Sequence, residues 1–211
     1  YMFKFAIGDK TGIDLPNEGN NLVSNLKTNR DLELAQASFG QGIALTPIST
    51  VRALSTLANG GTLITPHLVK EIQYKIGGKK TISYTPEEDR VRVVNPETSV
   101  EISRMLTVNV DQSLRGGSMR LNNYSVAAKT GTAQIASPMG GYYTDRYLHS
   151  FFGYFPSYEP RFLIFLFTYY PKEVKFASET LTDSFFNLTK FLINYYNIAP
   201  DREAAPSATA A

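Results

Sequence analysis

The chain has 211 residues, of which 43% are hydrophobic, so it is long enough to bury the core of one domain. Its 21 Lys and Arg residues are interspersed with 19 Asp and Glu residues, which creates no concentrated positive field and argues against nucleic acid as a partner. Cysteine is absent, and the two histidines, His67 and His149, lie far apart and away from acidic clusters, so we expect no disulfide, no metal site and no cofactor.

The start of the chain contains few regular signals. Residues 1–35 are rich in turn formers and show no sustained period, which predicts an irregular segment that packs against another part of the protein. The chain opens at Tyr1 without a signal-peptide pattern, so we expect a cut within a larger protein, with a processed terminus as the alternative. The longest apolar run, Phe162 to Phe167, is far shorter than the roughly 20 residues that cross a bilayer, so we expect no membrane span.

Two helices and a hairpin are predicted before residue 111. The first helix covers residues 47–59, because Thr46 is a suitable N-cap and Pro47 fits the first turn. Its apolar stripe consists of Ile48, Val51, Leu54, Leu57 and Ala58. The second helix begins at Asn95-Pro96-Glu97 and is expected to bury Ile102, Met105, Leu106 and Val110. Between the helices, alternation over residues 72–84 around Gly77-Gly78 predicts a peripheral β-hairpin.

The second half of the chain predicts a sheet and a covering helix. Strands are expected over residues 124–135, 150–155 and 161–170. A short, turn-rich connection makes the last two strands antiparallel neighbours, and the apolar run Phe162 to Phe167 predicts that the third is central and covered on both faces. Ser178 is expected to cap a helix that ends before Pro200, with the stripe Leu181, Phe185, Leu188, Leu192 and Tyr195. Residues 200–211 are predicted to form a disordered tail.

The tetrad Lys129-Thr130-Gly131-Thr132 lies within the first of these strands and is the candidate site. Lys129 offers a fixed positive charge that can hold a substrate carboxylate, at about 1.5–3 kcal/mol for each charge-assisted hydrogen bond. Alternation places Thr130 and Thr132 on one face, while Gly131 lets a substrate backbone approach closely. The Thr132 N–H can face a developing oxyanion if the strand lies at a sheet edge. An ordinary strand with a solvated lysine is the alternative that the tetrad alone leaves open.

Several blocks, in the same order along the chain, resemble class B penicillin-binding proteins. The N-terminal blocks are Thr11-Gly12-Ile13-Asp14-Leu15-Pro16 with Glu18-Gly19, then Ser38-Phe39-Gly40-Gln41-Gly42-Ile43, Thr46-Pro47, Ala58-Asn59-Gly60-Gly61 and Pro66-His67. The tetrad follows with Ala133 and Gln134, and the last blocks are Ser150-Phe151-Phe152-Gly153-Tyr154-Phe155-Pro156 and Pro160-Arg161. The Ser-Phe-Gly-Gln-Gly form and the Ala-Gln ending favour the division type over the elongation type.

This resemblance implies an α/β fold of the α+β type, in which helices cover a five-stranded antiparallel sheet, as in penicillin-binding transpeptidases and serine β-lactamases. It implies that residues 1–199 are the C-terminal portion of the transpeptidase domain, incomplete in this chain, with the hairpin 72–84 as an insertion. The implied activity is D,D-transpeptidation, in which a serine is acylated by the D-Ala-D-Ala end of one peptidoglycan stem peptide and transfers it to the amine of another. β-Lactams acylate the same serine.

The resemblance also implies roles for residues and partners. Lys129 and Thr132 are the implied catalytic residues, with Thr132 as the oxyanion donor, and the implied substrate-binding residues are Thr130, Gly131, Thr132 and Gln134. Beyond stem peptides and β-lactams, the implied partners are a glycosyltransferase and other cell-wall synthesis or division proteins. The implied location is the extracytoplasmic face of the cell membrane, through an anchor upstream of this chain.

The chain departs from the family pattern at its nucleophile motifs. It contains no Ser-x-Asn, and its Ser-x-x-Lys match, Ser24-Asn25-Leu26-Lys27, lies where the family has a variable connection, so we interpret that match as coincidental. Ala128 stands where the family prefers glycine. We therefore expect this chain to be inactive by itself.

Other residues carry weaker signals. His67 is expected to fix a turn rather than act as a base, and His149 cannot pair with Ser150 because adjacent strand residues face opposite ways. Tyr142 and Tyr143 are expected in a loop, where they contact substrate or shield the sheet. Two alternative functions stay open: a β-lactam sensor or β-lactamase of the same fold, and a non-catalytic module that binds cell-wall peptide or a division partner.

Overall fold

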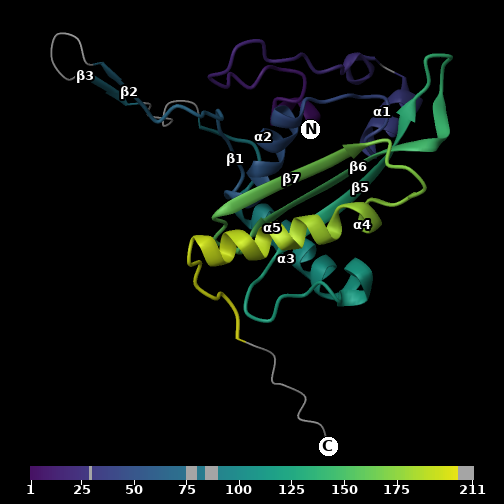
Figure 1. The fold of residues 1–211 in the computed structure, drawn as a ribbon. Helices are drawn as coiled ribbons and strands as arrows, with labels where there is room; N and C mark the ends of the chain where they lie inside the picture. Colours follow the sequence, from purple (N-terminus) through teal and green to yellow (C-terminus); the bar gives the residue numbers. More distant parts are fainter. Residues whose placement is uncertain (29, 75–79, 84–89, 204–211) are drawn as a thin grey trace, which may run out of the picture. The chain divides into compact units, whose positions relative to one another are not determined.

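The computed structural model describes residues 1–28, 30–74, 80–83 and 90–203 (Figure 1). The chain divides into two compact units, Tyr1–Pro96 and Glu97–Ala211. Among the described residues, no helix combines the length and the apolar character needed to cross a bilayer.

The first unit consists of short helices and two small antiparallel sheets. Strand β1 (Thr62–Leu63) pairs with β4 (Val91–Arg92), and β2 (Glu71–Tyr74) pairs with β3 (Lys80–Ser83). The predicted hairpin is therefore confirmed, while its turn at Gly77-Gly78 lies outside the described residues. The helical elements are the 3-10 turns η1 (Met2–Phe5) and η2 (Ser24–Lys27) and the α-helices α1 (Asp31–Ser38) and α2 (Pro47–Ala58).

Helix α2 confirms the first predicted helix but buries a different face. Thr46 caps it, because its hydroxyl accepts a hydrogen bond from the Ser49 N–H at 3.2 Å. The fully buried positions are Ser49, Ala53 and Thr56, whereas the predicted apolar stripe is only half-buried. Helix α1 was not predicted, because its apolar and polar residues do not separate into two faces.

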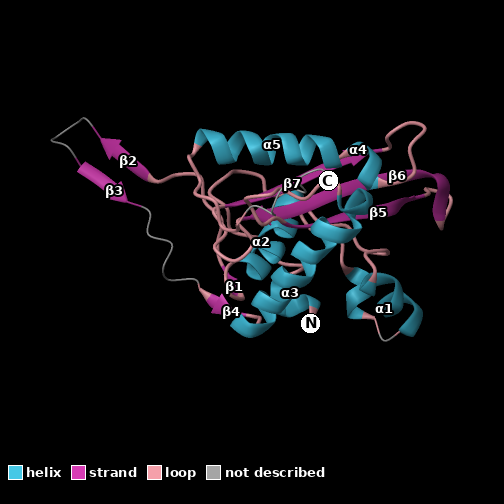
Figure 2. Cartoon of the chain, turned by 90° about the horizontal axis from the view of Figure 1, so that it is seen from below, coloured by secondary structure: helices cyan, strands magenta, loops and turns pink. Residues whose placement is uncertain are grey.

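The second unit contains a three-stranded antiparallel sheet in the order β5 (Ala127–Ala136), β6 (Tyr142–Phe155) and β7 (Phe162–Tyr169). Helices α4 (Ala177–Thr180) and α5 (Thr182–Tyr195) lie along one face, and α3 (Pro96–Val108) lies on the other (Figure 2). A π-helical turn, η4 (Asn109–Ser113), and the 3-10 turn η5 (Leu114–Gly117) follow α3. The prediction that the Phe162 to Phe167 strand is central is wrong for the described sheet, in which β6 is the middle strand.

The core of the second unit lies between β6 and α5. Phe151 stacks on Phe185 with ring centroids 4.4 Å apart, and both side chains are fully buried. Gly153 makes this packing possible, because a Cβ there would approach the Phe185 ring to 2.6 Å and the Ala128 methyl group to 2.7 Å. The cluster contains the buried residues Val110, Leu114, Val126, Ala128, Phe151, Phe155, Ile164, Leu181, Phe185, Phe186, Ile193 and Ile198.

Helix α3 is confirmed at its predicted start, but it docks through hydroxyl groups. Met105, predicted to be buried, is 56% exposed, and the buried positions are Ser99, Ser103 and Thr107. The Ser103 hydroxyl lies 2.7 Å from the Tyr154 hydroxyl on β6. The hydroxyl groups of Ser103 and Thr107 are both hydrogen-bonded, which offsets the cost of burying them.

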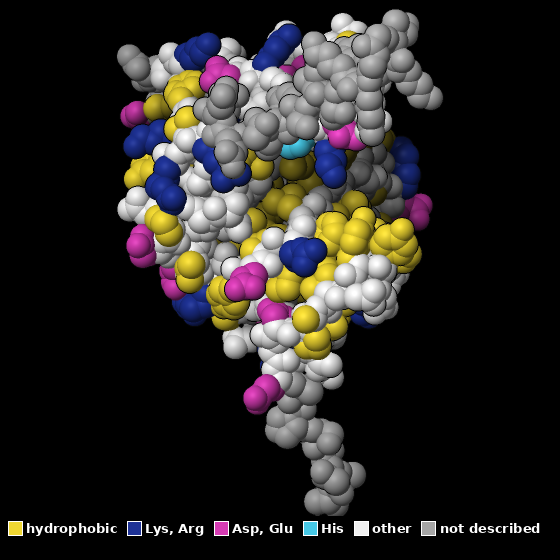
Figure 3. Space-filling view, turned by 90° about the vertical axis from the view of Figure 1, so that its left-hand side faces the viewer, with side chains coloured by type: hydrophobic (Ala, Val, Ile, Leu, Met, Phe, Trp, Pro, Cys, Tyr) yellow, Lys and Arg dark blue, Asp and Glu magenta, His cyan; other side chains and the backbone are white. Residues whose placement is uncertain are grey.

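The predicted C-terminal helix forms two elements and reaches the sheet by a shifted face. Leu181 separates α4 from α5, and Ser178 lies inside α4 instead of capping it. Leu188 and Tyr195, predicted to be buried, are exposed, while Phe186, Thr189 and Ile193 are buried in their place. Hydrophobic side chains therefore remain exposed on α5, among them Leu188, Phe191 and Tyr195. Figure 3 shows one side of the molecule, where hydrophobic side chains lie among charged ones.

The tail predicted over residues 200–211 is ordered at its beginning. The Asp201 carboxylate accepts hydrogen bonds from the N–H and the hydroxyl of Ser125, and Arg202 pairs with Asp111 at 2.7 Å. These partners lie far away in the sequence, so the local composition does not predict them. Residues 204–211 lie outside the described residues.

Candidate functional site

The tetrad lies in β5, an outer strand of the described sheet. Strand β5 pairs with β6 alone among the described strands, so its other edge makes no ladder there. The strand begins at Ala127, three residues later than its predicted start at Tyr124. The prediction for the Thr132 N–H required that its strand lie at the edge of a sheet, and β5 lies at an edge of the described sheet.

The two threonines share one face of β5, as predicted. Thr130 lies opposite Phe151 and Thr132 lies opposite His149, and these two β6 side chains point toward the side of α4 and α5. The Thr132 hydroxyl oxygen accepts a hydrogen bond from the Ala177 N–H at 3.1 Å. The start of α4 therefore fixes the position of the Thr132 side chain.

Lys129 and Gly131 face the opposite side of the strand. Lys129 is exposed, and its ammonium group donates to the carbonyl of Thr130 at 3.0 Å. Gly131 lies opposite Ser150, and a Cβ at Gly131 would come within 2.5 Å of the Ser150 hydroxyl oxygen. The glycine thus has a packing reason of its own, in addition to the close substrate approach predicted from the sequence.

The neighbouring positions on β5 support its geometry. Ala128, where the family resemblance prefers glycine, is fully buried, and its methyl group fills the space beside Gly153. The Gln134 side-chain amide donates to the carbonyl of Tyr143 at 3.1 Å, so this residue holds the two strands together near the hairpin tip. Tyr142 and Tyr143 belong to β6 and not to a loop, because β6 extends to Tyr142 through an irregular register.

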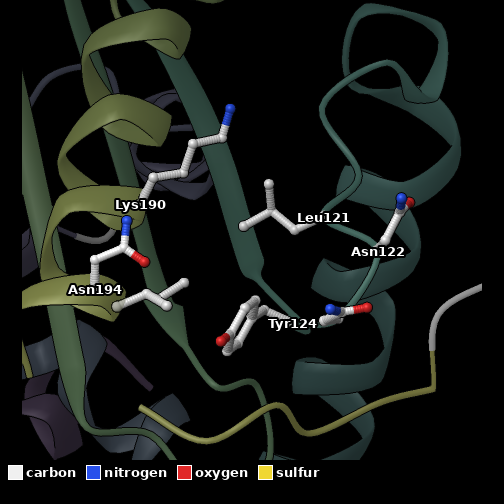
Figure 4. Close-up of a pocket in the computed structure, with 7 residues that line it drawn as sticks. Leu121, Asn122, Tyr124, Lys190 and Asn194 are labelled. Atoms are coloured by element: carbon white, nitrogen blue, oxygen red, sulfur yellow. The ribbon is translucent and has the colours of Figure 1, made fainter. Parts of the chain in front are cut away.

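No residue of the tetrad lines either of the two cavities described in the structure. One, of about 270 Å³, is lined by Leu121, Asn122, Asn123, Tyr124, Lys190, Ile193 and Asn194 (Figure 4). A second, of about 260 Å³, is lined by Ile64, Thr65, Pro66, His67 and Arg90. Within the described part of the chain, the tetrad therefore forms an open rim along a strand edge and not the wall of either cavity.

The two carboxylates of the first N-terminal block hold backbone N–H groups. The Glu18 carboxylate accepts hydrogen bonds from the N–H groups of Thr11 and Gly12 at 2.6 and 3.1 Å. Burial raises the pKa of this carboxyl group, but the hydrogen bonds outweigh burial and the pKa is lowered. Asp14 accepts from Val69 and Leu68 at 2.7 and 2.8 Å, and these bonds lower its pKa. The carboxylates thereby fold the block on itself and tie it to the segment after Pro66-His67.

The Ser24–Lys27 match has a structural role at its second position. Ser24 and Lys27 are both exposed on the single 3-10 turn η2. Asn25 donates to the carbonyl of Gly42 at 2.8 Å, and a Cβ at Gly42 would approach the Asn25 amide nitrogen to 2.8 Å. Ser24 therefore lies on an exposed 3-10 turn and not at the start of a buried helix, while the interpretation of the match as coincidental stays a prediction.

The two histidines lie in different surroundings. His67 lines the smaller cavity beside Pro66, whereas His149 is fully buried on β6. Alternation separates His149 from Ser150, as predicted: the His149 ring contacts Thr180 and Lys175, while Ser150 faces Gly131. The partners of His149 could not be predicted from sequence, because Lys175 and Thr180 lie 26 and 31 residues further along the chain.

The order and geometry of these blocks agree with one sequence family. The chain matches the penicillin binding protein transpeptidase domain over residues 1–187. It belongs to that family.

Relatives of this penicillin-binding transpeptidase chain are longer proteins. It is 36% identical over 172 residues to stage V sporulation protein D of Bacillus subtilis, an alignment that covers 82% of this chain and 26% of that protein. It is 26% identical over 215 residues to penicillin-binding protein PbpB of Mycolicibacterium smegmatis, covering 98% of this chain and 33% of that protein. The chain thus spans about a quarter to a third of these relatives.

Solved structures support the fold of the penicillin-binding transpeptidase chain. The crystal structure of penicillin-binding protein 3 from Mycobacterium tuberculosis in complex with ampicillin has a TM-score of 0.85 at 24% identity, covering 98% of this chain and 46% of that one. A putative peptidoglycan glycosyltransferase from Atopobium parvulum has a TM-score of 0.75 at 28% identity, covering 94% and 45%. The fold predicted from the sequence, an antiparallel sheet covered by helices in a penicillin-binding transpeptidase arrangement, is confirmed.

Proposed function

We propose that this chain is the C-terminal portion of a peptidoglycan D,D-transpeptidase domain, over residues 1–199 with the hairpin at 72–84 as an insertion. The observation that carries the proposal is the position of Lys129-Thr130-Gly131-Thr132 on an outer strand of a chain that belongs to the transpeptidase family. A strand edge of this kind can pair with an extended peptide through backbone hydrogen bonds, while its side chains select the peptide end.

Each residue of the strand has a proposed role. The Lys129 ammonium group attracts the terminal carboxylate of a stem peptide, and Thr130 and Gln134 help to hold that peptide. The Thr132 N–H stabilises the oxyanion that forms when the nucleophile adds to the carbonyl carbon. Gly131 leaves room for the substrate backbone.

The reaction needs a serine that this strand does not contain. In the proposed first step, the serine oxygen forms an ester with the penultimate D-Ala carbonyl carbon, and the terminal D-Ala leaves with the proton on its amine. In the second step, an amine of another stem peptide attacks the ester and the serine regains its proton. Because the sequence has no Ser-x-Asn and Ser24 is exposed on a single turn, we propose that residues outside this chain supply the nucleophile.

The proposed partners follow from this chemistry. They are stem peptides, β-lactams, a glycosyltransferase that supplies glycan strands, and other cell-wall synthesis or division proteins. Since stem peptides are joined outside the cytoplasm, we place the protein at the extracytoplasmic face of the cell membrane. A non-catalytic module that binds cell-wall peptide is the second candidate, and the absence of Ser-x-Asn from this chain is the observation that favours it.

Covalent labelling by fluorescent penicillin tests the proposal. We expect the longer polypeptide to be labelled and this chain by itself to remain unlabelled. Lys129→Ala in the longer polypeptide should reduce the acylation rate by about 100-fold or more, the size of effect that follows loss of a group that stabilises the transition state. Lys190→Ala is the matched control, because Lys190 is also an exposed lysine but lies on α5, and this variant should leave the rate unchanged.

Three results would contradict the proposal. Failure of the longer polypeptide to react with penicillin would favour the non-catalytic module. Normal acylation of the Lys129→Ala variant would make the strand structural. Labelling of this chain at Ser24 would show that the nucleophile lies within it.

A further inference from the structure

A buried histidine lies directly behind the candidate site. His149 on β6 is fully buried and stands opposite Thr132 in the register of β5 and β6. Its Nδ1 lies 2.9 Å from the Thr180 hydroxyl oxygen, and its Nε2 lies 3.0 Å from the carbonyl oxygen of Lys175. Each ring nitrogen therefore lies within hydrogen-bond distance of an oxygen atom in the segment from Lys175 to Thr180.

The carbonyl group beside Nε2 selects the tautomer in which that nitrogen carries the hydrogen. A carbonyl oxygen can only accept, so Nε2 must carry the hydrogen and donate it to Lys175. The Nδ1 atom then has a lone pair and accepts from the Thr180 hydroxyl group. That hydroxyl also lies 3.3 Å from the carbonyl of Ala177, a longer contact and thus the weaker alternative for its hydrogen.

His149 thereby holds the segment from Lys175 to Thr180 at both of its ends. Ala177 lies between these two contacts and is fully buried, and its N–H donates to the Thr132 hydroxyl oxygen at 3.1 Å. A hydrogen bond at each end restricts the small movements of the segment that would lengthen the bond in its middle.

The bond from Ala177 also determines what the Thr132 hydroxyl can do. The Thr132 hydroxyl oxygen accepts a hydrogen bond from the Ala177 N–H through one of its lone pairs. Thr132 is exposed, so its own O–H remains available to donate to an anionic or carbonyl group beyond the strand edge. An N–H donor behind the oxygen also polarises the hydroxyl group, which strengthens the outgoing hydrogen bond.

We propose that His149 is a positioning residue for Thr132: it clamps the segment Lys175–Thr180, and through the Ala177 N–H it orients the Thr132 hydroxyl as a hydrogen-bond donor to the substrate. The proposal rests on the proposed transpeptidase function. His149 does not touch the substrate in this arrangement. It acts by holding the backbone that holds Thr132.

The test measures the second-order rate of acylation by fluorescent penicillin in the longer polypeptide. His149→Phe removes both ring contacts, and Thr180→Val removes one contact while it leaves the ring in place. We expect each variant to slow acylation by about five- to tenfold, as loss of an ordering hydrogen bond implies. His149→Gln can still donate to the Lys175 carbonyl, so it should recover part of the rate that His149→Phe loses.

Thr189→Val provides the matched control. Thr189 is fully buried on α5, and its hydroxyl oxygen has no hydrogen-bond partner among the described residues. This control changes a buried threonine in the same isosteric way as Thr180→Val without breaking a bond, and it should acylate at the wild-type rate. The melting temperature and the fraction of protein that reacts with penicillin are measured for each variant, so that loss of fold is separated from loss of rate.

A double-mutant cycle with Thr132→Val decides whether His149 acts through Thr132. If it does, His149→Phe should slow the wild type but add little to the Thr132→Val variant, because the hydroxyl that it positions is already gone. Fully multiplicative effects would refute the proposal, and so would wild-type rates in His149→Phe and Thr180→Val. If His149→Phe does not fold, Thr180→Val in the same cycle carries the test. A wild-type protein that penicillin does not label would refute the proposed function, and this inference with it.

Discussion

Gly131→Ala separates two reasons for a glycine in the candidate strand. The new methyl group would lie 2.5 Å from the Ser150 hydroxyl oxygen, far inside normal contact distance, while the Ser150 Cβ would lie at 3.9 Å. Overpacking of this kind costs about 1–3 kcal/mol. The smaller backbone entropy of alanine in the unfolded chain returns about 0.4–1 kcal/mol, so we expect a net destabilisation of about 1–2 kcal/mol.

The second substitution of the pair removes the colliding atom. Ser150→Ala deletes the hydroxyl group and leaves the new methyl group in ordinary contact with the Ser150 Cβ position, so Gly131→Ala/Ser150→Ala should be as stable as Ser150→Ala alone. Thermal unfolding measures the difference, because 1 kcal/mol corresponds to about 2–4 °C in a domain of this size. Gly153→Ala, which would collide with backbone and ring atoms at 2.6–2.8 Å, has no such rescue by Ser150→Ala and is the control.

Acylation of the same variants in the longer polypeptide then shows whether the substrate also needs this glycine. If close approach of the substrate backbone matters, the double variant should regain its melting temperature and still react slowly with penicillin. Recovery of both stability and rate would mean that Gly131 is required only by Ser150. A Gly131→Ala variant with unchanged stability would refute the collision itself.

Three further outcomes are expected. Hydrogen bonds from backbone N–H groups lower the Asp14 pKa, so their contribution to stability is present above the ordinary pKa of about 3.9 and is lost as the pH falls through the lowered pKa. The Val69 amide proton resonance should follow this titration in the wild type and should not do so in Asp14→Asn. Burial raises the Tyr154 pKa, so the contribution of the neutral phenol to stability is present below about pH 10 and is lost as the pH rises through the raised pKa. In thermal unfolding, Tyr154→Phe should remove this loss at alkaline pH. At neutral pH it should cost about 1 kcal/mol, because the hydrogen bond with Ser103 is lost. Arg202→Ala should destabilise the second unit by about 1–3 kcal/mol in the same assay, because it leaves the largely buried Asp111 carboxylate without its partner.

Local signals account for the parts of the fold that the sequence predicts well. Thr46 and Pro47 determine the start of α2 through interactions within one turn, and the short connection after Phe155 determines that β6 and β7 are antiparallel. The tetrad lies on a strand with its two threonines on one face, as predicted, because alternation along a strand needs no tertiary information.

Non-local partners account for what the sequence does not predict. The order of the strands depends on pairing between β5 and β6, which the apolar run in β7 does not encode. Ser103 and Thr107 appear polar in sequence, but distant hydroxyl groups on and beyond β6 satisfy them. In the candidate site, the link from Ala177 to Thr132 connects residues 45 positions apart, so no local pattern could reveal it.

The hydroxyl-lined face of α3 has a consequence for how the helix is oriented. The hydrophobic effect has no preferred direction, whereas a hydrogen bond weakens steeply when its angle changes. Bonds of 2.7 Å from Ser103 to Tyr154 and from Thr107 to Ser157 therefore specify the rotation of α3 about its own axis as well as its distance from β6. Replacing Ser103 and Thr107 with alanine should leave α3 helical but allow several rotations of the helix about its axis.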